Sequence, residues 1–359
     1  MRIFIIARGY PSPQEPTWGC FEKDQAEALV QLGHNVTVIT TIRHEDDYSL
    51  NSGVRRWVLN EMHLSRWNLV NKCKRFGKLR SICKENDIEV LIAFLGGAVS
   101  YSVLAGIGLK TKVIASERNS PAFTYKSMLR RIWAKCIYSL SNGVVFQTND
   151  AKEWFPKMVQ RKSVVIPNPV KDVFYSTPYA PRLNEIISIG RLTEQKNFQL
   201  LIEAFDLVVG IVPNARLSIY GEGHLEEPLQ RLIDEKGLST HIKLKGRTYD
   251  VPKVLSEASI FVMSSDVEGM PNALMEAMTI GVPSVSTDCP CGGPRFLLSE
   301  ERGLLSPVGD AAELAKKILI LLEDEQQREA YSLRSKTYMM QFRQEIITAK
   351  WVDFISSLR

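Results

Sequence analysis

Short apolar runs rich in Ile and Val alternate with amphipathic segments along the whole chain. This alternation is typical of parallel strands that crossover helices bury on both faces, so it predicts an α/β protein. The runs in the first half predict strands at Arg2–Ala7, Asn35–Thr40, Val54–Leu59, Glu89–Phe94, Lys112–Ser116, Val144–Thr148 and Ser163–Pro167. The runs in the second half predict strands at Glu185–Gly190, Ala215–Gly221, Ile242–Gly246, Ser259–Met263 and Pro283–Thr287.

Prolines separate the two series of strands, at Asn168-Pro169-Val170 and again at Pro178 and Pro181. Few regular contacts are expected to cross such a boundary. The length of 359 residues also exceeds what one hydrophobic core usually serves. We therefore expect two doubly wound, Rossmann-like sheets that face each other across a cleft. The predicted division is an N-terminal domain at 1–172, a C-terminal domain at 173–340, and a last amphipathic helix at 341–359 that returns to the first domain.

Composition excludes several classes of protein. Hydrophobic residues make up 45% of the chain, but no uninterrupted apolar run reaches the roughly 18 residues of a membrane span. Met1–Ala7 leads directly into a domain and shows no cleavable signal pattern, so we expect a cytoplasmic location. The six cysteines are scattered, and Cys289 and Cys291 have no second pair to complete a zinc site, which predicts free, buried thiols.

The net charge of +5 hides an asymmetry between the two halves. Residues 1–170 carry 24 Lys and Arg against 14 Asp and Glu, whereas the remainder carries 21 against 26. Nine of the basic residues lie between Arg55 and Lys84, interleaved with aromatic residues and with Glu61 as the one acid. Such a mixture predicts peripheral binding to the anionic inner face of the cell membrane. A solvated helix face is the alternative, and nucleic acid is discounted because no base-reading module is evident.

Two cations follow the first predicted strand of the second domain. They are Arg191 and Lys196 in Gly190-Arg191-Leu192-Thr193-Glu194-Gln195-Lys196-Asn197, directly before a helix predicted from Asn197 to Val209. Ligands of doubly wound sheets bind at this carboxyl edge of the strands. Arg offers a bidentate fork and Lys a point charge, so together they suit a diphosphate. A surface salt bridge is the alternative.

Two carboxylates flank the start of a later helix, in Glu268-Gly269-Met270-Pro271-Asn272-Ala273-Leu274-Met275-Glu276. Pro271 suits the first turn of that helix, where its missing N–H costs nothing. Carboxylates accept hydrogen bonds from vicinal hydroxyls, so Glu268 and Glu276 suit the sugars of a nucleotide sugar. A glycoside hydrolase pair fits less well, because eight residues of helix span about 12 Å, against roughly 5 to 9.5 Å in hydrolases.

A third candidate is the start of the first helix at Thr17-Trp18-Gly19-Cys20. Gly19 there would let backbone N–H groups approach a phosphate, although a structural glycine is equally compatible. The spacing is not G-x-G-x-x-G, which argues against a nicotinamide dinucleotide. No D-x-D triplet occurs in the chain. We therefore expect neither a metal ion nor another cofactor, with the two cations in place of Mg²⁺.

Together these motifs resemble the retaining GT-B glycosyltransferases of family 4. The resemblance covers the second half of the chain and the Gly19 loop. The motifs that carry it are Gly190-Arg191 with Lys196, Tyr220-Gly221-Glu222-Gly223, Gly246-Arg247-Thr248, Glu268 with Glu276, and Gly303-Leu304-Leu305 with Pro307 and Asp310. The segment from Asp288 to Arg295 is similar to the subgroup that builds bacterial surface polysaccharides and lipid-linked oligosaccharides, often with N-acetylhexosamine donors.

The resemblance implies a role for each matched residue. Arg191, Lys196 and Glu268 are the catalytic residues, the two cations on the donor diphosphate and Glu268 on the transferred sugar. Glu276 holds the ribose hydroxyls, and the backbone around Arg247 holds the base. The donor-binding residues implied in this way are Gly19, Gly190, Arg247, Thr248, Gly269, Met270, Asn272, Ala273, Leu274 and Glu276.

The chain departs from the family at one position. Many members place a histidine after a first-domain strand to contact the sugar, whereas this chain has Ser116-Glu117-Arg118-Asn119. We expect Glu117, Arg118 or Asn119 to contact the sugar or the acceptor instead.

The resemblance also implies the reaction. A sugar, expected to be an N-acetylhexosamine, moves from a UDP-sugar to a hydroxyl of a lipid-linked or polysaccharide acceptor, and its anomeric configuration is retained. Because the departing diphosphate gathers negative charge, Arg191 and Lys196 stabilise the transition state more than the ground state. Two alternatives remain open, a UDP-sugar 2-epimerase on the same architecture and a non-catalytic nucleotide-sugar-binding subunit.

Overall fold

The chain forms two compact units, each with its own sheet and hydrophobic core. The computed structural model describes every residue except 8–19, 41–52, 60–68, 95, 183 and 359, and only the backbone of 7, 20–22 and 69–74. The first domain comprises Met1–Asn168 and Glu345–Arg359, and the second domain comprises Pro169–Gln344.

A parallel sheet of seven strands forms the centre of the first domain in the described part of the chain. The strands are β1 (Arg2–Ala7), β2 (Asn35–Thr40), β3 (Arg55–Val58), β4 (Val90–Phe94), β5 (Lys112–Ser116), β6 (Gly143–Phe146) and β7 (Ser163–Val165). Their order is β3-β2-β1-β4-β5-β6-β7, so the chain proceeds from the middle to one edge and then returns to fill the other. Every residue of β4 is buried, which explains its unbroken apolar run.

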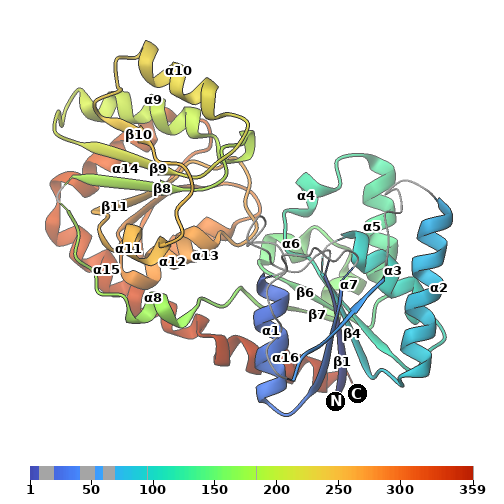
Figure 1. Cartoon of the computed structure of the whole chain (residues 1–359). Helices are drawn as coiled ribbons and strands as arrows, with labels where there is room; N and C mark the ends of the chain where they lie inside the picture. Colours follow the sequence, from blue (N-terminus) through green and yellow to red (C-terminus); the bar gives the residue numbers. More distant parts are fainter. Residues whose placement is uncertain (8–19, 41–52, 60–68, 95, 183, 359) are drawn as a thin grey trace. The chain divides into compact units, whose positions relative to one another are not determined.

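Helices cover both faces of this sheet. They are α1 (Cys20–Gln31), α2 (Leu69–Glu85), α3 (Gly96–Gly106), α4 (Pro121–Thr124), α5 (Met128–Leu140), α6 (Asn149–Glu153), α7 (Lys157–Arg161) and the C-terminal α16 (Gln344–Ser357). Figure 1 shows α2, α3 and α5 on one side of the sheet and α1 and α16 on the other. The chain turns after α1 at Gly33, which has the left-handed φ of 81° that favours glycine.

The C-terminal helix α16 packs on the first sheet. Trp351 of α16 is fully buried, and its ring centroid lies 5.8 Å from that of Phe94 in β4. At Gly143 in β6, an added Cβ would lie only 2.8 Å from both Phe354 and Leu358. This close approach requires glycine at the start of β6, so the last helix is an integral part of the first domain.

The second domain repeats the same winding with six strands among the described residues. They are β8 (Glu185–Ile189), β9 (Arg216–Tyr220), β10 (Ile242–Leu244), β11 (Ile260–Met263), β12 (Ser284–Thr287) and β13 (Leu304–Ser306), in the order β10-β9-β8-β11-β12-β13. The sequence predicted five of them and missed β13. Only Leu304 and Leu305 form its apolar run, directly before Pro307, which is too short for the pattern of a buried strand.

Helices also cover both faces of the second sheet. They are α8 (Asp172–Ser176), α9 (Phe198–Val209), α10 (Glu226–Glu235), α11 (Val251–Ser256), α12 (Asn272–Ile280), α13 (Gly293–Leu298), α14 (Ala311–Glu323) and α15 (Glu325–Met339), with 3-10 turns at Glu194–Lys196 and Met340–Phe342. Figure 1 shows α9, α10 and α14 on one face and α11, α12 and α15 on the other. The core between α9, α14 and the sheet includes the fully buried Leu201, Phe205 and Ile318.

Among the residues whose side chains are described, Cys83, Cys289 and Cys291 are buried thiols that form no disulfide. Burial raises the pKa of the Cys83 thiol to about 11. The prediction of buried thiols is wrong for Cys136, which is exposed on α5. None of the helices in the described part of the chain is long and apolar enough to cross a membrane.

Candidate functional site

The ends of β8 and β11 meet where the strand order of the second sheet reverses. β8 lies between β9 and β11, with Ile186 opposite Ile260. In a doubly wound sheet the loops at this point diverge to opposite faces, which leaves room for a ligand. Lys196 follows β8, Glu268 follows β11, and Lys196 Nζ lies 2.6 Å from Glu268 Oε1. The side chains are only 17% and 10% exposed, so the two predicted catalytic residues form a largely buried ion pair.

Hydroxyl groups at the end of β11 fix this ion pair. Ser265 Oγ donates to Glu268 Oε1 over 2.8 Å, and Ser264 Oγ donates to the backbone carbonyl of Lys196 over 2.9 Å. The backbone of Glu268 is held as well, because its N–H donates to the carbonyl of Pro290 at 2.8 Å. Both members of the pair therefore have little freedom to move before a ligand arrives.

Asn197 links the same two loops and begins α9. The sequence placed it in the first turn of the helix, but it is the N-cap: its Oδ1 accepts from Leu200 N at 3.1 Å. Its φ of 43° is left-handed, a conformation that asparagine tolerates better than most residues. Asn197 Nδ2 also donates to Asp266 Oδ1 at 2.8 Å, and Gln195 Nε2 donates to the carbonyl of Val267 at 2.8 Å. The predicted helix boundary was therefore wrong by one residue, because the cap residue serves the loop contact.

Glycines let the loops after β8, β9 and β10 approach one another. Gly190 N donates to the carbonyl of Tyr220, and Gly221 N donates to the carbonyl of Gly246. Gly221 has a φ of 149°, and an added Cβ would lie 1.8 Å from the carbonyl oxygen of Gly190. A side chain at Gly221 would therefore displace the turn that leads to Arg191.

The start of α12 lies beside Glu268. Pro271 is the N-cap and makes no side-chain cap bond, so the prediction that it occupies the first turn was wrong by one residue. The first N–H groups of a helix lack intrahelical acceptors, which leaves the backbone donors of Asn272–Leu274 suited to a phosphate. The preceding turn is tightly packed: Met270 is 6% exposed, and a Cβ on Gly293 would lie 1.9 Å from the Gly269 carbonyl oxygen.

Glu276 lies in the second turn of α12 and is half-buried. Burial raises the pKa of its carboxyl to about 7, and the charge of Lys171 partly opposes this rise. Within the described residues, no group donates a hydrogen bond to this carboxylate. The estimate of about 12 Å between Glu268 and Glu276 assumed a continuous helix. It was wrong in that assumption, because α12 begins only at Asn272.

Arg191 and Arg247, the two arginines that the sequence analysis assigns to the site, differ in their surroundings. Arg191 is exposed, and its side chain makes no ion pair in the described part of the chain. Arg247 follows β10 and lies 5.2 Å from the ring centroid of the exposed Tyr249. Thr248 Oγ1 accepts from Asp250 N at 3.2 Å, which orders the same loop. Arg191 is thus available to a ligand, and the Arg247 loop has a defined shape.

The first domain contributes a different group at the end of β5. Glu117 is 1% exposed, and its Oε2 accepts hydrogen bonds from the hydroxyls of Tyr138 and Tyr125 at 2.8 and 2.9 Å. Its Oε1 accepts from the backbone N–H groups of Arg118 and Asn119, each at 3.2 Å. Burial raises the pKa of this carboxyl, and these hydrogen bonds oppose the rise. The carboxylate is thus occupied inside the domain, so we no longer expect Glu117 to contact a sugar.

Arg118 and Asn119 remain as first-domain candidates, and Gly19 lies outside the described residues. The Arg118 guanidinium donates to Asn168 Oδ1, which also accepts from Gln147 Nε2 at 2.6 Å. Arg118, Gln147 and Asn168 follow β5, β6 and β7, so they converge at one edge of the sheet. The sequence analysis missed the last two, although a polar residue just beyond a buried strand was the signal available.

Side chains that could bind a metal near the site have other partners. Asp288 Oδ2 accepts from Arg295 at 2.8 Å. Burial raises the pKa of Cys289 to about 12, helped by the charge of Glu268, so the metal-binding thiolate is disfavoured. Over the described ranges, no three His, Cys, Asp or Glu side chains come together as a metal site. The absence of a cofactor stays a prediction.

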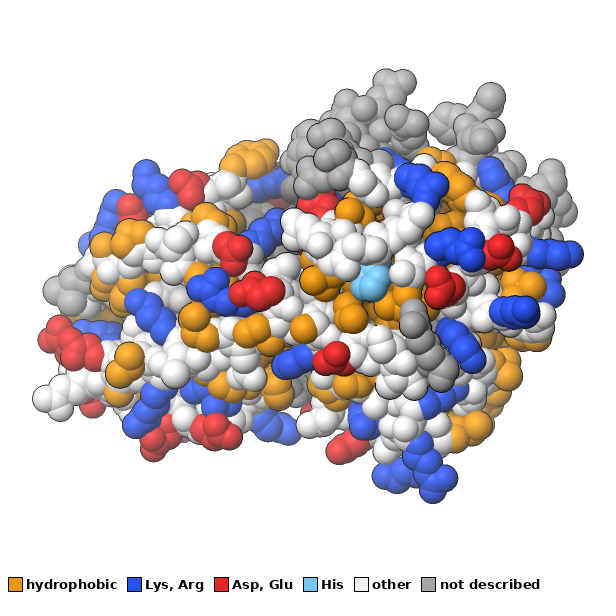
Figure 2. All heavy atoms as spheres, turned by 90° about the horizontal axis from the view of Figure 1, so that it is seen from below, with side chains coloured by type: hydrophobic (Ala, Val, Ile, Leu, Met, Phe, Trp, Pro, Cys, Tyr) orange, Lys and Arg blue, Asp and Glu red, His pale blue; other side chains and the backbone are white. Residues whose placement is uncertain are grey.

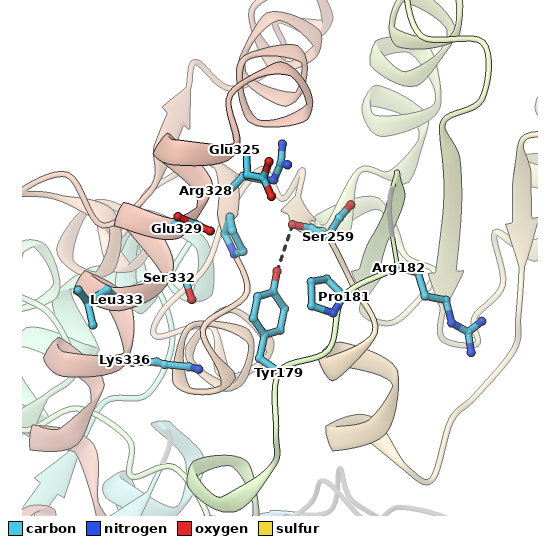
Figure 3. Close-up of a pocket in the computed structure, with 11 residues that line it drawn as sticks. Tyr179, Pro181, Arg182, Ser259, Glu325, Arg328, Glu329, Ser332, Leu333 and Lys336 are labelled. Carbon is cyan, nitrogen blue, oxygen red and sulfur yellow. Dashed lines mark hydrogen bonds between the residues drawn. The ribbon is translucent and has the colours of Figure 1, made fainter.

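A pocket of about 460 Å³ lies elsewhere in the second domain. Figure 3 shows Tyr179 beneath Ser259, with a distance of 3.5 Å from the tyrosine hydroxyl to the serine carbonyl. Ser259 and Pro283, which line it, directly precede β11 and β12. The pocket is therefore at the amino ends of these strands, whereas the ion pair of Lys196 and Glu268 lies beyond the carboxyl ends.

Both halves of the chain match models of known protein families. A family model described as "Glycosyl transferases group 1" matches residues 176–337, and one described as "Glycosyltransferase Family 4" matches residues 23–173. A relative from Campylobacter jejuni is 26% identical over 332 residues and covers 91% of each chain. It is named GalNAc-α-(1→4)-GalNAc-α-(1→3)-diNAcBac-PP-undecaprenol α-1,4-N-acetyl-D-galactosaminyltransferase.

Two solved structures share the whole fold. Sucrose-phosphate synthase from Thermosynechococcus elongatus aligns with a TM-score of 0.83 and 17% identity, covering 100% of this chain and 99% of its own. The Anabaena HepE protein in complex with UDP aligns with a TM-score of 0.81 and 16% identity, covering 99% and 100%. Together with the two parallel sheets, these likenesses confirm the predicted fold class.

Proposed function

Because the chain belongs to the family 4 glycosyltransferases of the GT-B fold, we propose that it moves an N-acetylhexosamine from a UDP-sugar to a hydroxyl of a lipid-linked glycan, with retention of the anomeric configuration. The family assignment makes the chain a glycosyltransferase, so the epimerase and the non-catalytic subunit are set aside. The Campylobacter relative supports the finer proposal by its name, which specifies N-acetylgalactosamine and a diphospho-undecaprenol carrier. The HepE structure supports UDP, which it contains.

One observation carries the proposal: Lys196 and Glu268 meet at the reversal point of the second sheet, next to the start of α12. A cation and backbone N–H groups suit the diphosphate, and a carboxylate suits the hydroxyls of the sugar. Lys196 and Arg191 bind the diphosphate with the N–H groups of Asn272–Leu274. Glu268 orients the transferred sugar. Glu276 accepts from the ribose hydroxyls, since no protein group in the described chain occupies its carboxylate.

The proposed step is a single displacement on one face of the sugar. The acceptor oxygen forms a bond to the anomeric carbon while the bond from that carbon to the β-phosphate oxygen breaks. The acceptor proton passes to that phosphate oxygen, and UDP leaves. Lys196 stabilises the charge that develops on the leaving diphosphate. Because the ion pair with Glu268 already holds Lys196 in place, little reorganisation is needed before the reaction.

Calorimetry with UDP, GDP and ADP tests the donor assignment. We expect heat with UDP, and a larger thermal stabilisation by UDP-N-acetylhexosamines than by GDP- or ADP-sugars, because a ligand of the native state raises its melting temperature. No heat with any nucleoside diphosphate would refute the proposed site. NMR of the product tests retention, and an inverted anomeric centre would overturn that part. Transfer should persist in EDTA, because the proposed clamp contains no metal ion.

A further inference from the structure

The side chains of the first two turns of α5 are largely exposed. All six residues from Met128 to Trp133 are exposed, and four of them are large and apolar. The exposed fractions are 76% for Met128, 80% for Leu129, 50% for Ile132 and 52% for Trp133. Single exposed apolar residues are common on proteins, but a contiguous group of this kind usually marks an interaction surface.

Two side chains of these turns also bond within the domain, because Trp133 Nε1 donates to Ser100 Oγ at 3.2 Å and Arg131 Nε donates to the Tyr125 carbonyl at 3.1 Å. Met128, Leu129 and Ile132 are nevertheless at least 50% exposed. The α5 residues that enter the core, Ala134, Ile137 and Tyr138, all lie in the second half of the helix. Ser127 caps the first turn, with its Oγ accepting from Arg130 N. The first two turns are therefore a regular, capped helix that exposes Met128, Leu129 and Ile132 to solvent.

The stretch of sequence around this apolar group contains cations but no acids. Residues 118–149 contain no Asp or Glu and five cations, four of which are Lys126, Arg130, Arg131 and Lys135. Lys126 lies 4.4 Å from the ring centroid of Phe123, which is 43% exposed. The short helix α6 carries Asp150 and Glu153, and the ring centroid of Trp154 directly after it lies 4.9 Å from Lys135 Nζ. Two helices that pack on α5 add no acid, since α3 is uncharged and α7 carries only basic charges. In contrast, Figure 2 shows Lys and Arg interspersed with Asp and Glu on the face that it displays.

We propose that this region, the α5 surface, docks the enzyme on an anionic lipid bilayer. Its members are Phe123, Lys126, Met128, Leu129, Arg130, Ile132 and Trp133. A bilayer accepts exposed apolar and aromatic side chains at the boundary of its headgroups, and anionic headgroups attract the interleaved cations. The inference deepens the proposed function, on which it rests for the lipid-linked acceptor, by locating the surface that brings the enzyme to that acceptor.

A second copy of the chain is a poorer occupant of the α5 surface. A symmetric contact places the same patch on both subunits, so the cations of the two copies would face each other. The acid-free segment 118–149 offers them no carboxylate as a partner. An anionic partner resolves this repulsion, whereas an identical partner increases it.

In the other basic and aromatic segment, between Arg55 and Lys84, many of the described side chains make contacts inside the domain. Arg80 Nη1 donates to the carbonyls of Ala105 and Ile107 at 2.8 and 2.6 Å. The ring of Trp57 is 5.2 Å from that of Phe4 in an edge-to-face contact. Further bonds join Lys78 to the Val58 carbonyl, Arg55 to Asn35 and Arg56 to Thr40. On the α5 surface Trp133 bonds to Ser100, but Met128, Leu129 and Ile132 remain at least 50% exposed, so it is the stronger docking surface.

Flotation with vesicles tests the proposal on the full-length enzyme. The probes are vesicles of phosphatidylglycerol with phosphatidylcholine, and vesicles of phosphatidylcholine alone. We expect the wild type to float with the anionic vesicles and to lose at least tenfold in binding with Met128→Gln/Leu129→Gln, where glutamine preserves helix propensity. Lys126→Glu/Arg130→Glu should lose at least fivefold for each cation reversed, and high salt should weaken wild-type binding.

Matched controls distinguish vesicle binding by the α5 surface from nonspecific binding by other exposed apolar or basic side chains. Leu32→Gln/Ile107→Gln removes apolar side chains that are 56% and 51% exposed in the same domain, and it should float as the wild type does. Lys78→Glu/Lys84→Glu reverses charges of the other basic segment and should cost less than the α5 pair. The proposal is overturned if the wild type does not float, if it binds phosphatidylcholine equally, or if the α5 variants keep their binding. Self-association that the α5 variants abolish would assign the surface to a second copy instead.

Donor binding distinguishes a failure here from a failure of the proposed function. The α5 variants should bind UDP like the wild type and transfer sugar normally to a water-soluble acceptor, while losing transfer to an acceptor embedded in anionic vesicles. If the wild type binds no UDP but floats, the proposed function is wrong and the α5 surface stands. If UDP binds and the α5 variants transfer normally to the vesicle-borne acceptor, the α5 surface is wrong and the donor site stands.

Discussion

Glu117 in the first domain and Glu276 in the second both lie beyond a central strand, but their carboxylates have opposite surroundings. Glu117 accepts four hydrogen bonds from two tyrosines and two backbone N–H groups. Glu276 accepts none from the described residues, although burial raises its pKa to about 7. A buried acid whose acceptors are satisfied maintains the fold, whereas one without donors is suited to a ligand. Position after a strand is therefore a weaker guide to function than the partners of the side chain.

The largest expected effect is on stability, at Glu117. Glu117→Leu removes the acceptor of the Tyr125 and Tyr138 hydroxyls and leaves both donors buried. Each unsatisfied buried donor costs about 1 to 3 kcal/mol, so we expect the first domain to lose about 2 to 6 kcal/mol of unfolding free energy. Chemical denaturation followed by intrinsic fluorescence measures this loss. Glu153→Leu, which replaces an exposed carboxylate of the same domain, is the control and should unfold near the wild-type midpoint.

A Glu117→Leu enzyme as stable as the wild type would contradict the structural role of this residue. A second variant, Glu117→Gln, tests the same structural role by a smaller change. Its amide oxygen can still accept from the tyrosines, but its NH₂ group would face the N–H groups of Arg118 and Asn119. We therefore expect a loss between those of Glu117→Leu and the control.

The next effect is on catalysis, at the ion pair of the second domain. Lys196→Ala removes the proposed charge on the leaving diphosphate, so turnover should fall by about 10² to 10³, or about 3 to 4 kcal/mol. Initial rates at saturating donor measure it. The matched control is Lys236→Ala, because Lys236 Nζ also lies 2.8 Å from a carboxylate oxygen, that of Asp206, but near the surface. Near-normal turnover of Lys196→Ala would remove Lys196 from the site.

Most of the fold could be predicted from the sequence, because buried parallel strands leave long apolar runs. Each of the twelve predicted strands has a counterpart whose ends lie within two residues of the predicted ones. The exception, β13, contains two leucines between Gly303 and Pro307, and its burial depends on β12 beside it. Helix starts at Asn197 and Pro271 were misplaced by one residue, because a cap is defined by a hydrogen bond or backbone angle that composition does not specify.

The candidate site could be predicted only in part. Strand ends supplied Lys196 and Glu268, but their contact at 2.6 Å spans 72 residues and follows from the pairing of β8 with β11. The hydrogen bonds of Glu117 could not be predicted for a related reason. Its partners Tyr125 and Tyr138 come from later segments, and nothing in their spacing indicates that both hydroxyls point to one carboxylate. Side-chain partners across elements depend on tertiary packing, which a single sequence pattern does not contain.

A smaller effect is expected on donor affinity, at Glu276. Hydrogen bonds from the ribose favour the ionised carboxylate, so donor binding should strengthen as the pH rises through about 7 and then level off. Glu276→Gln should bind the donor about 10- to 100-fold more weakly than the wild type at pH 8. This factor corresponds to the loss of a hydrogen bond to a charged group, which contributes about 1.5 to 3 kcal/mol. The deficit should shrink below about pH 6, where the wild-type carboxyl is protonated. Calorimetry with UDP from pH 5.5 to 8.5 measures this, and an equal pH dependence in both enzymes would exclude ribose contact by Glu276.

The smallest effect separates Glu276 from Glu117 without any ligand. The folded-state pKa of Glu276 is raised from an ordinary 4.5 to about 7, so between these pH values the native state holds a proton that the unfolded state has released. Stability therefore falls as the pH rises through this window, and the full loss is present above about pH 7. Glu276→Gln lacks this penalty. Because the side chain is half-buried, solvent screening reduces the gain to about 1 kcal/mol at pH 8, or about 2 to 4 °C, and it should vanish near pH 4.5. Thermal unfolding at the two pH values measures the difference, and a Glu276→Gln enzyme less stable than the wild type at pH 8 would make Glu276 a structural acid like Glu117.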